Sequence, residues 1–342
     1  MISANVSVII PCYKMGRYVG EALESVGSQT YSDWEIVVVD DAGPEDGTRL
    51  MVAEFARRFP DHRVEFLRNE TNRGVSAARN TAVHIAKGRL LAFLDPDDLW
   101  LPDKLLKQLQ VFEADKTAAL VYSQARILRS GAGINFSPGI EITGNPPENE
   151  TTAATLAVAN GMLMFAISSL VIKRETFDAV GGFRENLPFQ NEDRLLIGSC
   201  ALFGRMAWVS EPLCVYRMHD GSVTTTVIKK EIAHLVEFDL VARIALWLRY
   251  QPHGRIIGSQ IVNGILRERL LQTLAAPSWF HSRDLLVDLC AQLTLAYPSA
   301  GIFLMLRFLQ QSPALAFGRR VVRHLVRRQV DTKSQRCLAK KI

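Results

Sequence analysis

Cysteines are few in this sequence, and none is paired in a C-x-x-C motif. The five that occur stand singly along 342 residues, at Cys12, Cys200, Cys214, Cys290 and Cys337. Neither a disulfide framework of the kind found in small secreted proteins nor thiolate zinc ligation is therefore expected. Reduced thiols in a cytoplasmic compartment are the better interpretation.

Long apolar runs are also lacking, since no stretch reaches the roughly 18 residues that a transmembrane helix requires. The first residues, MISANVSVIIPCY, have neither the cationic start nor the small-residue cleavage site of a secretory signal. We therefore expect a cytoplasmic protein. Any contact with a membrane would be peripheral, on the inner face of the cytoplasmic membrane.

A glycine-rich dinucleotide fingerprint is missing as well. After the first apolar segment the sequence reads PCYKMGRYVG, which contains no G-x-G-x-x-G turn. This absence argues against a dinucleotide-dependent oxidoreductase.

The composition is that of an ordinary globular protein, with 48% hydrophobic and 22% charged residues. The net charge of +5 is unevenly distributed. Residues 1–230 carry a net charge of −4 and residues 231–342 one of +9, all of which arises after residue 304. A basic partner surface would thus belong to the C-terminal tail alone.

The N-terminal part alternates short β-branched segments with longer helical ones, the pattern of an α/β fold on a mostly parallel sheet. The predicted strands include VSVII, WEIVVVD, RVEFLR, RLLAFLD and AALVYS, with helical segments between them. SSLVIKRETF and MAWVSEPLCVYRMH predict further strands, and NEDRLLIGSCALFG predicts a helix between them. From about residue 228 the periodicity is helical, so we expect two domains, 1–227 and 228–342.

The segment LLAFLDPDDLW places three carboxylates at the end of a predicted strand: Asp95, Asp97 and Asp98. Like charges this close raise one another's pKa, and a divalent cation relieves the repulsion. Carboxylate oxygens suit Mg²⁺ or Mn²⁺, which complete their coordination shells with substrate phosphates. A turn followed by a helix cap is the alternative, because aspartate is common in both.

Four segments in order give this chain a family resemblance: VSVIIPCYK, QTYSDWEIVVVDDAGPEDGT, NRGVSAARN and GRLLAFLDPDDLWLPDKL. Over about residues 5–225 the chain resembles the family 2 glycosyltransferases, which transfer a sugar from a nucleotide diphosphate on a GT-A fold. The resemblance implies a Rossmann-like, mostly parallel sheet flanked by helices, with a C-terminal helical extension.

The resemblance also implies roles for individual residues at the strand ends. The donor nucleotide would be bound by Pro11, Tyr13, Asp41, Arg79, Asp95 and Asp97. The metal, Mn²⁺ or Mg²⁺, would be ligated by Asp97, Asp98 and His219. In GGFRENLPFQNEDRLL, Asp193 would be the general base and Glu192 a supporting or acceptor-binding group.

The predicted function is an inverting, metal-dependent glycosyltransferase that moves a sugar from a nucleotide diphosphate, with UDP favoured, to an acceptor hydroxyl. The acceptor would be a glycan or a lipid-linked glycan in cell-surface polysaccharide synthesis. Two alternatives remain open from the residues: a Mg²⁺-dependent phosphohydrolase with an aspartyl nucleophile, and an inactive nucleotide- or membrane-binding scaffold.

Two segments stand outside the resemblance. Residues 131–152 are rich in Gly, Pro and Asn and predict a loop that could order over a ligand. Residues 313–341 begin with PALAFGRRVVRHLVRRQV, the pattern of a basic amphipathic helix. That helix would lie on an anionic membrane surface or pack on the domain. No nucleic-acid partner is expected.

Overall fold

A computed structural model of the chain describes residues 5–129, 166–185, 192–201 and 203–219, with scattered residues between 238 and 297. The chain divides into two compact units, Met1–Thr226 and Val227–Ile342. The second unit is described only in part and includes a π-helical turn at Val262–Leu266. The predicted loop at 131–152 and the predicted tail at 313–341 lie outside the described residues.

The described part of the first unit is built on one sheet in the order β3-β2-β1-β4-β7-β6-β8-β5. All strands except β5 and β7 run in the same direction. The strands are β1 (Val6–Cys12), β2 (Trp34–Asp40), β3 (Val64–Arg68), β4 (Leu90–Phe93), β5 (Leu99–Trp100), β6 (Ala118–Arg129), β7 (Val171–Lys173) and β8 (Arg205–Met218). The mixed, mostly parallel α/β sheet confirms the predicted fold class.

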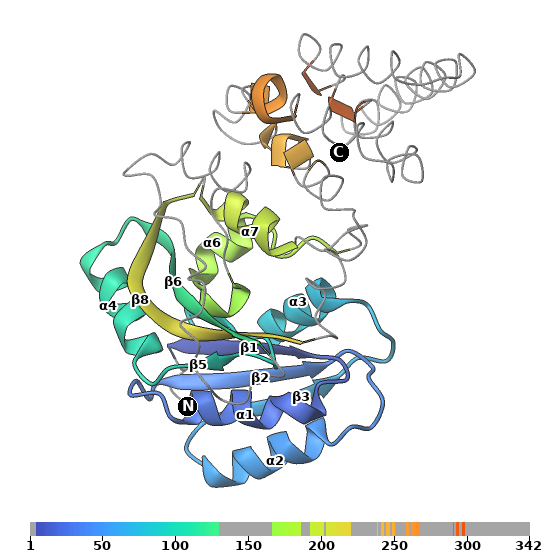
Figure 1. Ribbon diagram of the computed structural model, residues 1–342, viewed down its shortest axis with the longest axis vertical. Helices are drawn as coiled ribbons and strands as arrows, with labels where there is room; N and C mark the ends of the chain where they lie inside the picture. The colour runs from blue at the N-terminus through green and yellow to red at the C-terminus, as the bar shows by residue number, and fades with distance from the viewer. Residues whose placement is uncertain are drawn as a thin grey trace, which may run out of the picture. The chain divides into compact units, whose positions relative to one another are not determined.

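Helices cover both faces of this sheet. Figure 1 shows α1 and α2 on one face of β1 and β2, and α3 on the other. The helices are α1 (Gly16–Gly27), α2 (Thr48–Arg58), α3 (Val75–Ile85), α4 (Lys104–Ala114), α6 (Arg174–Ala179) and α7 (Glu192–Cys200), with the 3-10 turn η1 (Ile167–Ser169). Because both faces are covered, β1 and β2 are buried along their whole length, as their continuous apolar sequences require.

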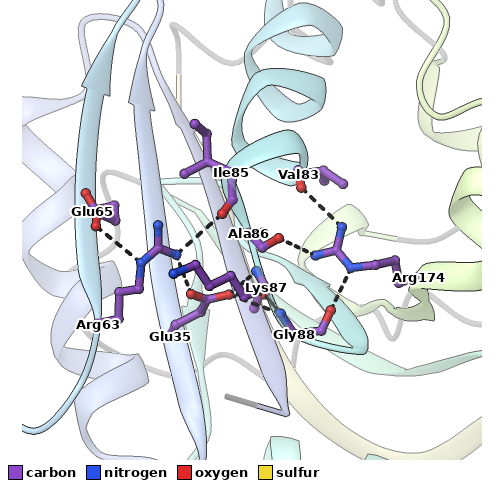
Figure 2. Close-up of polar contacts among 10 residues, drawn as sticks. Glu35, Arg63, Glu65, Val83, Ile85, Ala86, Lys87, Gly88 and Arg174 are labelled. Atoms are coloured by element: carbon purple, nitrogen blue, oxygen red, sulfur yellow. Dashed lines mark hydrogen bonds and ion pairs between the residues drawn. The ribbon is translucent and has the colours of Figure 1, made fainter. Parts of the chain in front are cut away.

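One predicted element is partly wrong. The segment SSLVIKRETF forms only a three-residue strand, β7, between the turn η1 and the short helix α6. The chain leaves the sheet at Arg174, whose guanidinium donates to the carbonyls of Gly88 (2.7 Å), Ala86 (2.9 Å) and Val83 (3.2 Å). These carbonyls lie at the end of α3 and just beyond it, where a cation is favoured, and Figure 2 shows the contacts.

A buried carboxylate holds the amino ends of β1, β2 and β4 together. Glu35 is 1% exposed and accepts hydrogen bonds from the hydroxyl of Ser7 (2.6 Å), the backbone N–H groups of Lys87 and Gly88, and Arg63 (2.5 Å). Figure 2 shows Arg63, Lys87 and Gly88 around the Glu35 carboxylate. These donors outweigh its burial and lower its pKa. We call these five residues the Glu35 cluster.

Candidate active site

The predicted site residues lie at the carboxyl ends of the parallel strands, opposite the Glu35 cluster. Pro11 lies buried near the end of β1, and Tyr13 follows with 41% of its surface exposed. The ammonium of Lys14 lies 5.0 Å from the centroid of the Tyr13 ring. Lys14 and Ala42, which follow β1 and β2, both have positive φ angles, 60° and 56°. Backbone strain of this kind is concentrated at functional sites.

Asp41 follows β2 and is buried. Its carboxylate accepts hydrogen bonds from the side chain of Asn69 (2.7 Å) and from the backbone N–H groups of Arg73 (3.0 Å) and Gly74 (2.7 Å). Gly74 directly precedes α3, so the carboxylate lies where a helix N-terminus favours negative charge. In the structure Asp41 thus fixes the loop before α3, and its predicted contact with the donor nucleotide stays a prediction.

Arg79 joins two predicted parts of the site. It lies buried in α3 and donates to Asp95 through one terminal nitrogen (2.7 Å) and to Glu192 through the other (2.7 Å). The ring of Phe183 packs on its guanidinium, 5.1 Å from ring centroid to Cζ. The two carboxylates raise the pKa of Arg79 despite its burial, so it stays cationic. We call this the Arg79 bridge.

The D-P-D-D segment forms a turn in which the Asp98 N–H donates to the Asp95 carbonyl (3.0 Å). Asp97 meets the ring of His219, with Oδ2 3.1 Å from Nε2. Asp98 points elsewhere and accepts hydrogen bonds from the Ser168 hydroxyl (2.5 Å) and the Arg217 N–H (2.9 Å). Burial and the neighbouring carboxylates raise the pKa values of Asp97 and Asp98.

The predicted metal ligands do not converge on one point. Among the described residues, no group of three or more His, Cys, Asp or Glu side chains is arranged to hold a metal ion. Asp97 and His219 do lie together, whereas Asp98 is bonded to Ser168 and Arg217. The pair offers a hard carboxylate oxygen and an imidazole nitrogen beside excess negative charge, so its chemistry fits a divalent cation.

His219 is held by an aromatic contact that the sequence did not reveal. The ring of Tyr18 in α1 stacks on it, with centroids 5.1 Å apart and planes at 25°. The guanidinium groups of Arg17 and Arg217 lie 4.8 Å and 4.9 Å from the Tyr18 ring centroid. The family resemblance implied a role for His219, but nothing in the spacing of α1 singled out Tyr18.

The predicted base lies in the first turn of α7. Asp193 accepts a hydrogen bond from the Arg194 N–H (2.7 Å). Burial, and after it the neighbouring charge of Glu192, raise the pKa of Asp193 to about 6. A carboxyl group with this pKa can accept a proton near neutral pH, as a general base must.

Comparison with known proteins now decides the class of this protein. A family model described as "Glycosyl transferase family 2" matches residues 7–206, which is more than half of the chain. The chain belongs to glycosyltransferase family 2. The predicted family and enzyme class are thus confirmed, and the phosphohydrolase alternative falls away.

Two curated relatives illustrate the range of this glycosyltransferase family. An uncharacterized glycosyltransferase of Haemophilus influenzae is 34% identical over 243 residues, covering 68% of this chain and 76% of the relative. WfgD of Escherichia coli, named as a UDP-Glc:alpha-D-GlcNAc-diphosphoundecaprenol beta-1,3-glucosyltransferase, is 42% identical over 106 residues. The second match covers 31% of this chain and 40% of WfgD.

Solved structures share the fold of this glycosyltransferase. The crystal structure of S. aureus TarS 1-349 in complex with UDP-GlcNAc has a TM-score of 0.64 and 19% sequence identity. The match covers 88% of this chain and 83% of that one. At this sequence identity the likeness concerns the fold alone.

No described helix is long and apolar enough to cross a membrane.

Proposed function

We propose that this glycosyltransferase moves a sugar from a UDP-sugar to a hydroxyl group of a glycan or lipid-linked acceptor, with inversion at the anomeric carbon. The observation that carries the proposal is the Arg79 bridge. It ties the D-P-D-D turn, which would face the donor diphosphate, to the start of α7, which carries the candidate base. A transferase needs these two functions side by side.

Asp193 supplies the base in this proposal. At pH 7 its carboxyl group is mostly ionised, since its pKa is about 6, and it takes the proton from the acceptor hydroxyl. The acceptor oxygen then bonds to the anomeric carbon while the bond to the diphosphate breaks on the opposite face. This single displacement inverts the configuration, so an α-linked donor gives a β-linked product.

Asp97 and His219 would hold the metal ion, Mn²⁺ or Mg²⁺. When bound, such an ion supplies Lewis-acid stabilisation of the negative charge on a leaving diphosphate. The protein prepares this position by bringing a carboxylate and an imidazole within 3.1 Å of each other and by stacking Tyr18 on the imidazole.

The names of the relatives support the choice of substrates. WfgD and WfaP of Escherichia coli are named for UDP-Glc as donor and a diphosphoundecaprenol-linked acceptor. TarS has been crystallised with UDP and with UDP-GlcNAc. We therefore place UDP first among the donor nucleotides and a lipid-linked glycan first among the acceptors.

Calorimetric titration tests the donor and metal assignments. UDP, GDP and dTDP are added to the protein with Mn²⁺ and with chelator, and the titrations are repeated with Asp97→Asn and with Asp61→Asn, an exposed control. We expect UDP to bind most tightly of the three nucleotides, and only with Mn²⁺. This binding should occur in the wild type and in the Asp61→Asn control, but not in Asp97→Asn. Preference for GDP or dTDP, or equal UDP binding with chelator, would refute the corresponding assignment.

A lipid-linked acceptor would place the enzyme at a membrane surface, and the basic segment 313–341 is our candidate for that contact. Flotation with vesicles containing anionic lipid tests it. The full chain should float with the vesicles at low salt, whereas a chain ending at residue 312 should not. Equal flotation of both chains would exclude this segment as the membrane contact.

A further inference from the structure

Ser168 contacts the segment from Asp95 to Trp100 in three ways, although it lies about 70 residues further along the chain. Its side chain is fully buried, at 0% exposure. Its hydroxyl donates to Asp98 Oδ2 (2.5 Å) and accepts from the backbone N–H of Asp95 (2.9 Å). Its carbonyl accepts from the indole N–H of Trp100 (2.7 Å). One serine thus binds the start, the middle and the end of the segment from Asp95 to Trp100.

Asp98 extends this contact to β8. Its second oxygen, Oδ1, accepts from the N–H of Arg217 (2.9 Å), and Arg217 lies two residues before His219. Asp98 is only 1% exposed, and both of its carboxylate oxygens accept hydrogen bonds from within the protein. The side chain connects η1, the turn and the end of β8, the segments that bring Asp97 and His219 together.

A second layer of buried side chains fixes η1 from behind. The amide of Gln108 in α4 donates to the carbonyls of Ser169 (2.8 Å) and Val121 (3.0 Å). The ammonium of Lys104 donates to Gln108 (2.7 Å) and lies 4.1 Å from the centroid of the Trp100 ring. Because its surroundings are packed and hydrogen-bonded, η1 gives the Ser168 hydroxyl a fixed position.

We propose that Ser168 and Asp98 are positioning residues that hold Asp97 against His219, and that Asp98 does not ligate the metal. The inference rests on the proposed function, because it concerns the metal pair of that site. The inference changes the predicted role of Asp98: its two oxygens accept from the Ser168 hydroxyl and the Arg217 N–H. Asn at position 98 has nearly the same shape: its Oδ1 can accept from the Arg217 N–H, and its Nδ2 can donate to the Ser168 oxygen, reversing that hydrogen bond. Ala can make neither contact.

The test is the affinity for Mn²⁺ in the presence of UDP, followed by the electron paramagnetic resonance signal of free Mn²⁺. We expect Asp97→Asn to raise the dissociation constant more than tenfold, as loss of a ligand does. Asp98→Ala and Ser168→Ala should raise it about tenfold, the effect of a lost outer-shell partner. Asp98→Asn should stay within about threefold of the wild type.

Ser169→Ala is the matched control. Ser169 is equally buried, and its hydroxyl has no hydrogen-bond partner within the described part of the chain, so its loss should leave Mn²⁺ affinity unchanged. If Asp98→Asn weakens Mn²⁺ as much as Asp97→Asn does, Asp98 is a ligand and the inference is wrong. If Ser168→Ala behaves like Ser169→Ala, the Ser168 hydroxyl positions nothing and the inference is equally wrong.

Amide hydrogen exchange separates this inference from the proposed function. A wild-type protein that binds no Mn²⁺ refutes the metal requirement, and positioning is then judged from exchange at the Arg217 amide. In Ser168→Ala and Asp98→Ala that amide should exchange at least tenfold faster, with rescue in Asp98→Asn. Unchanged exchange in both alanine variants would overturn the positioning role.

Discussion

The two ends of the same sheet treat buried carboxylates in opposite ways. At the amino ends of the strands, Glu35 is surrounded by donors and its pKa is lowered. At the carboxyl ends, the half-buried Asp97 and the buried Asp98 lie beside other carboxylates and their pKa values are raised. Glu35 and Asp98 are both 1% exposed, so between these two the neighbours decide the direction of the pKa shift. At the amino ends of the strands, donors of the fold itself compensate the carboxylate. At the carboxyl ends, negative charge is left over with which a ligand can interact.

The largest expected effect is a loss of transfer activity, at the carboxyl ends of the strands. Asp193→Asn removes the proton acceptor and should lower kcat on the order of 10²–10⁴-fold. Nucleotide binding should be retained, because Asn has nearly the same shape and the Arg79 bridge runs through Glu192. The measurement is steady-state transfer alongside UDP titration. Near-normal transfer by this variant would show that another group is the base.

The pH profile of the wild type gives a second measure of the same assignment. A base with a pKa of about 6 is ionised above that pH and protonated below it. The rate should therefore fall as the pH drops below about 6. A rate that is level from pH 5 to pH 8 would contradict the role of Asp193.

Substitution of Glu35, at the amino ends of the strands, should lower the stability of the fold and leave the transfer activity in place. Glu35→Gln keeps one oxygen for the N–H groups of Lys87 and Gly88 but sets its amide NH₂ against the Arg63 guanidinium, which is also a donor. We therefore expect a loss of about 2–3 kcal/mol in the free energy of unfolding. Glu65→Gln is the matched control, because Glu65 pairs with the same Arg63 (3.2 Å) but its side chain is 46% exposed. The control should lose less than about 1 kcal/mol.

The pH dependence of this loss has a definite sign. Because the pKa of Glu35 is lowered in the folded protein, its stabilisation is complete above the ordinary value of 4.5. It disappears as the pH falls through the lowered pKa. Denaturant unfolding at pH 7 and at lower pH should therefore show the wild type and Glu35→Gln converging in acid. A constant difference would mean that the carboxylate charge is not what stabilises the cluster.

A further effect on stability alone concerns Lys104, the buried lysine of α4. Desolvation lowers the pKa of Lys104 to about 7, so between about pH 7 and pH 10 the folded state binds fewer protons than the unfolded chain. Stability relative to Lys104→Met should thus rise with pH in that window, at about 1.4 kcal/mol per unit. Below pH 7 the difference should be constant. Unfolding at pH 6, 7, 8 and 9 measures it.

The sequence predicted the parallel half of the sheet because strands buried on both faces have continuous apolar sequences. It missed β5, which has only two residues, and α6, where the chain turns away at Arg174 without a glycine or proline to mark the change. Which face of β5 or α6 is buried depends on elements far away in the chain. In addition, segments this short have too few residues to show a periodicity in the sequence.

The positions of the candidate site residues were predictable where these residues follow strand ends. Asp41, Asp95 and Asp97 lie at such ends, and their number and order were visible in the sequence. Ser168 was not, since a serine between apolar residues has no spacing that predicts a contact with Asp98. Glu35 did leave a signal, because one charge within WEIVVVD must find partners in a buried strand.

The Arg79 bridge has a consequence for recombining this enzyme with its relatives. Glu192 and Asp95 come from segments about 100 residues apart, and each depends on the same guanidinium. A chimera with a crossover between these segments would inherit the arginine from one parent and one of its carboxylates from the other. Donor and acceptor specificities can be exchanged between parents only if all three residues match, so crossovers beyond α7 are the safer choice.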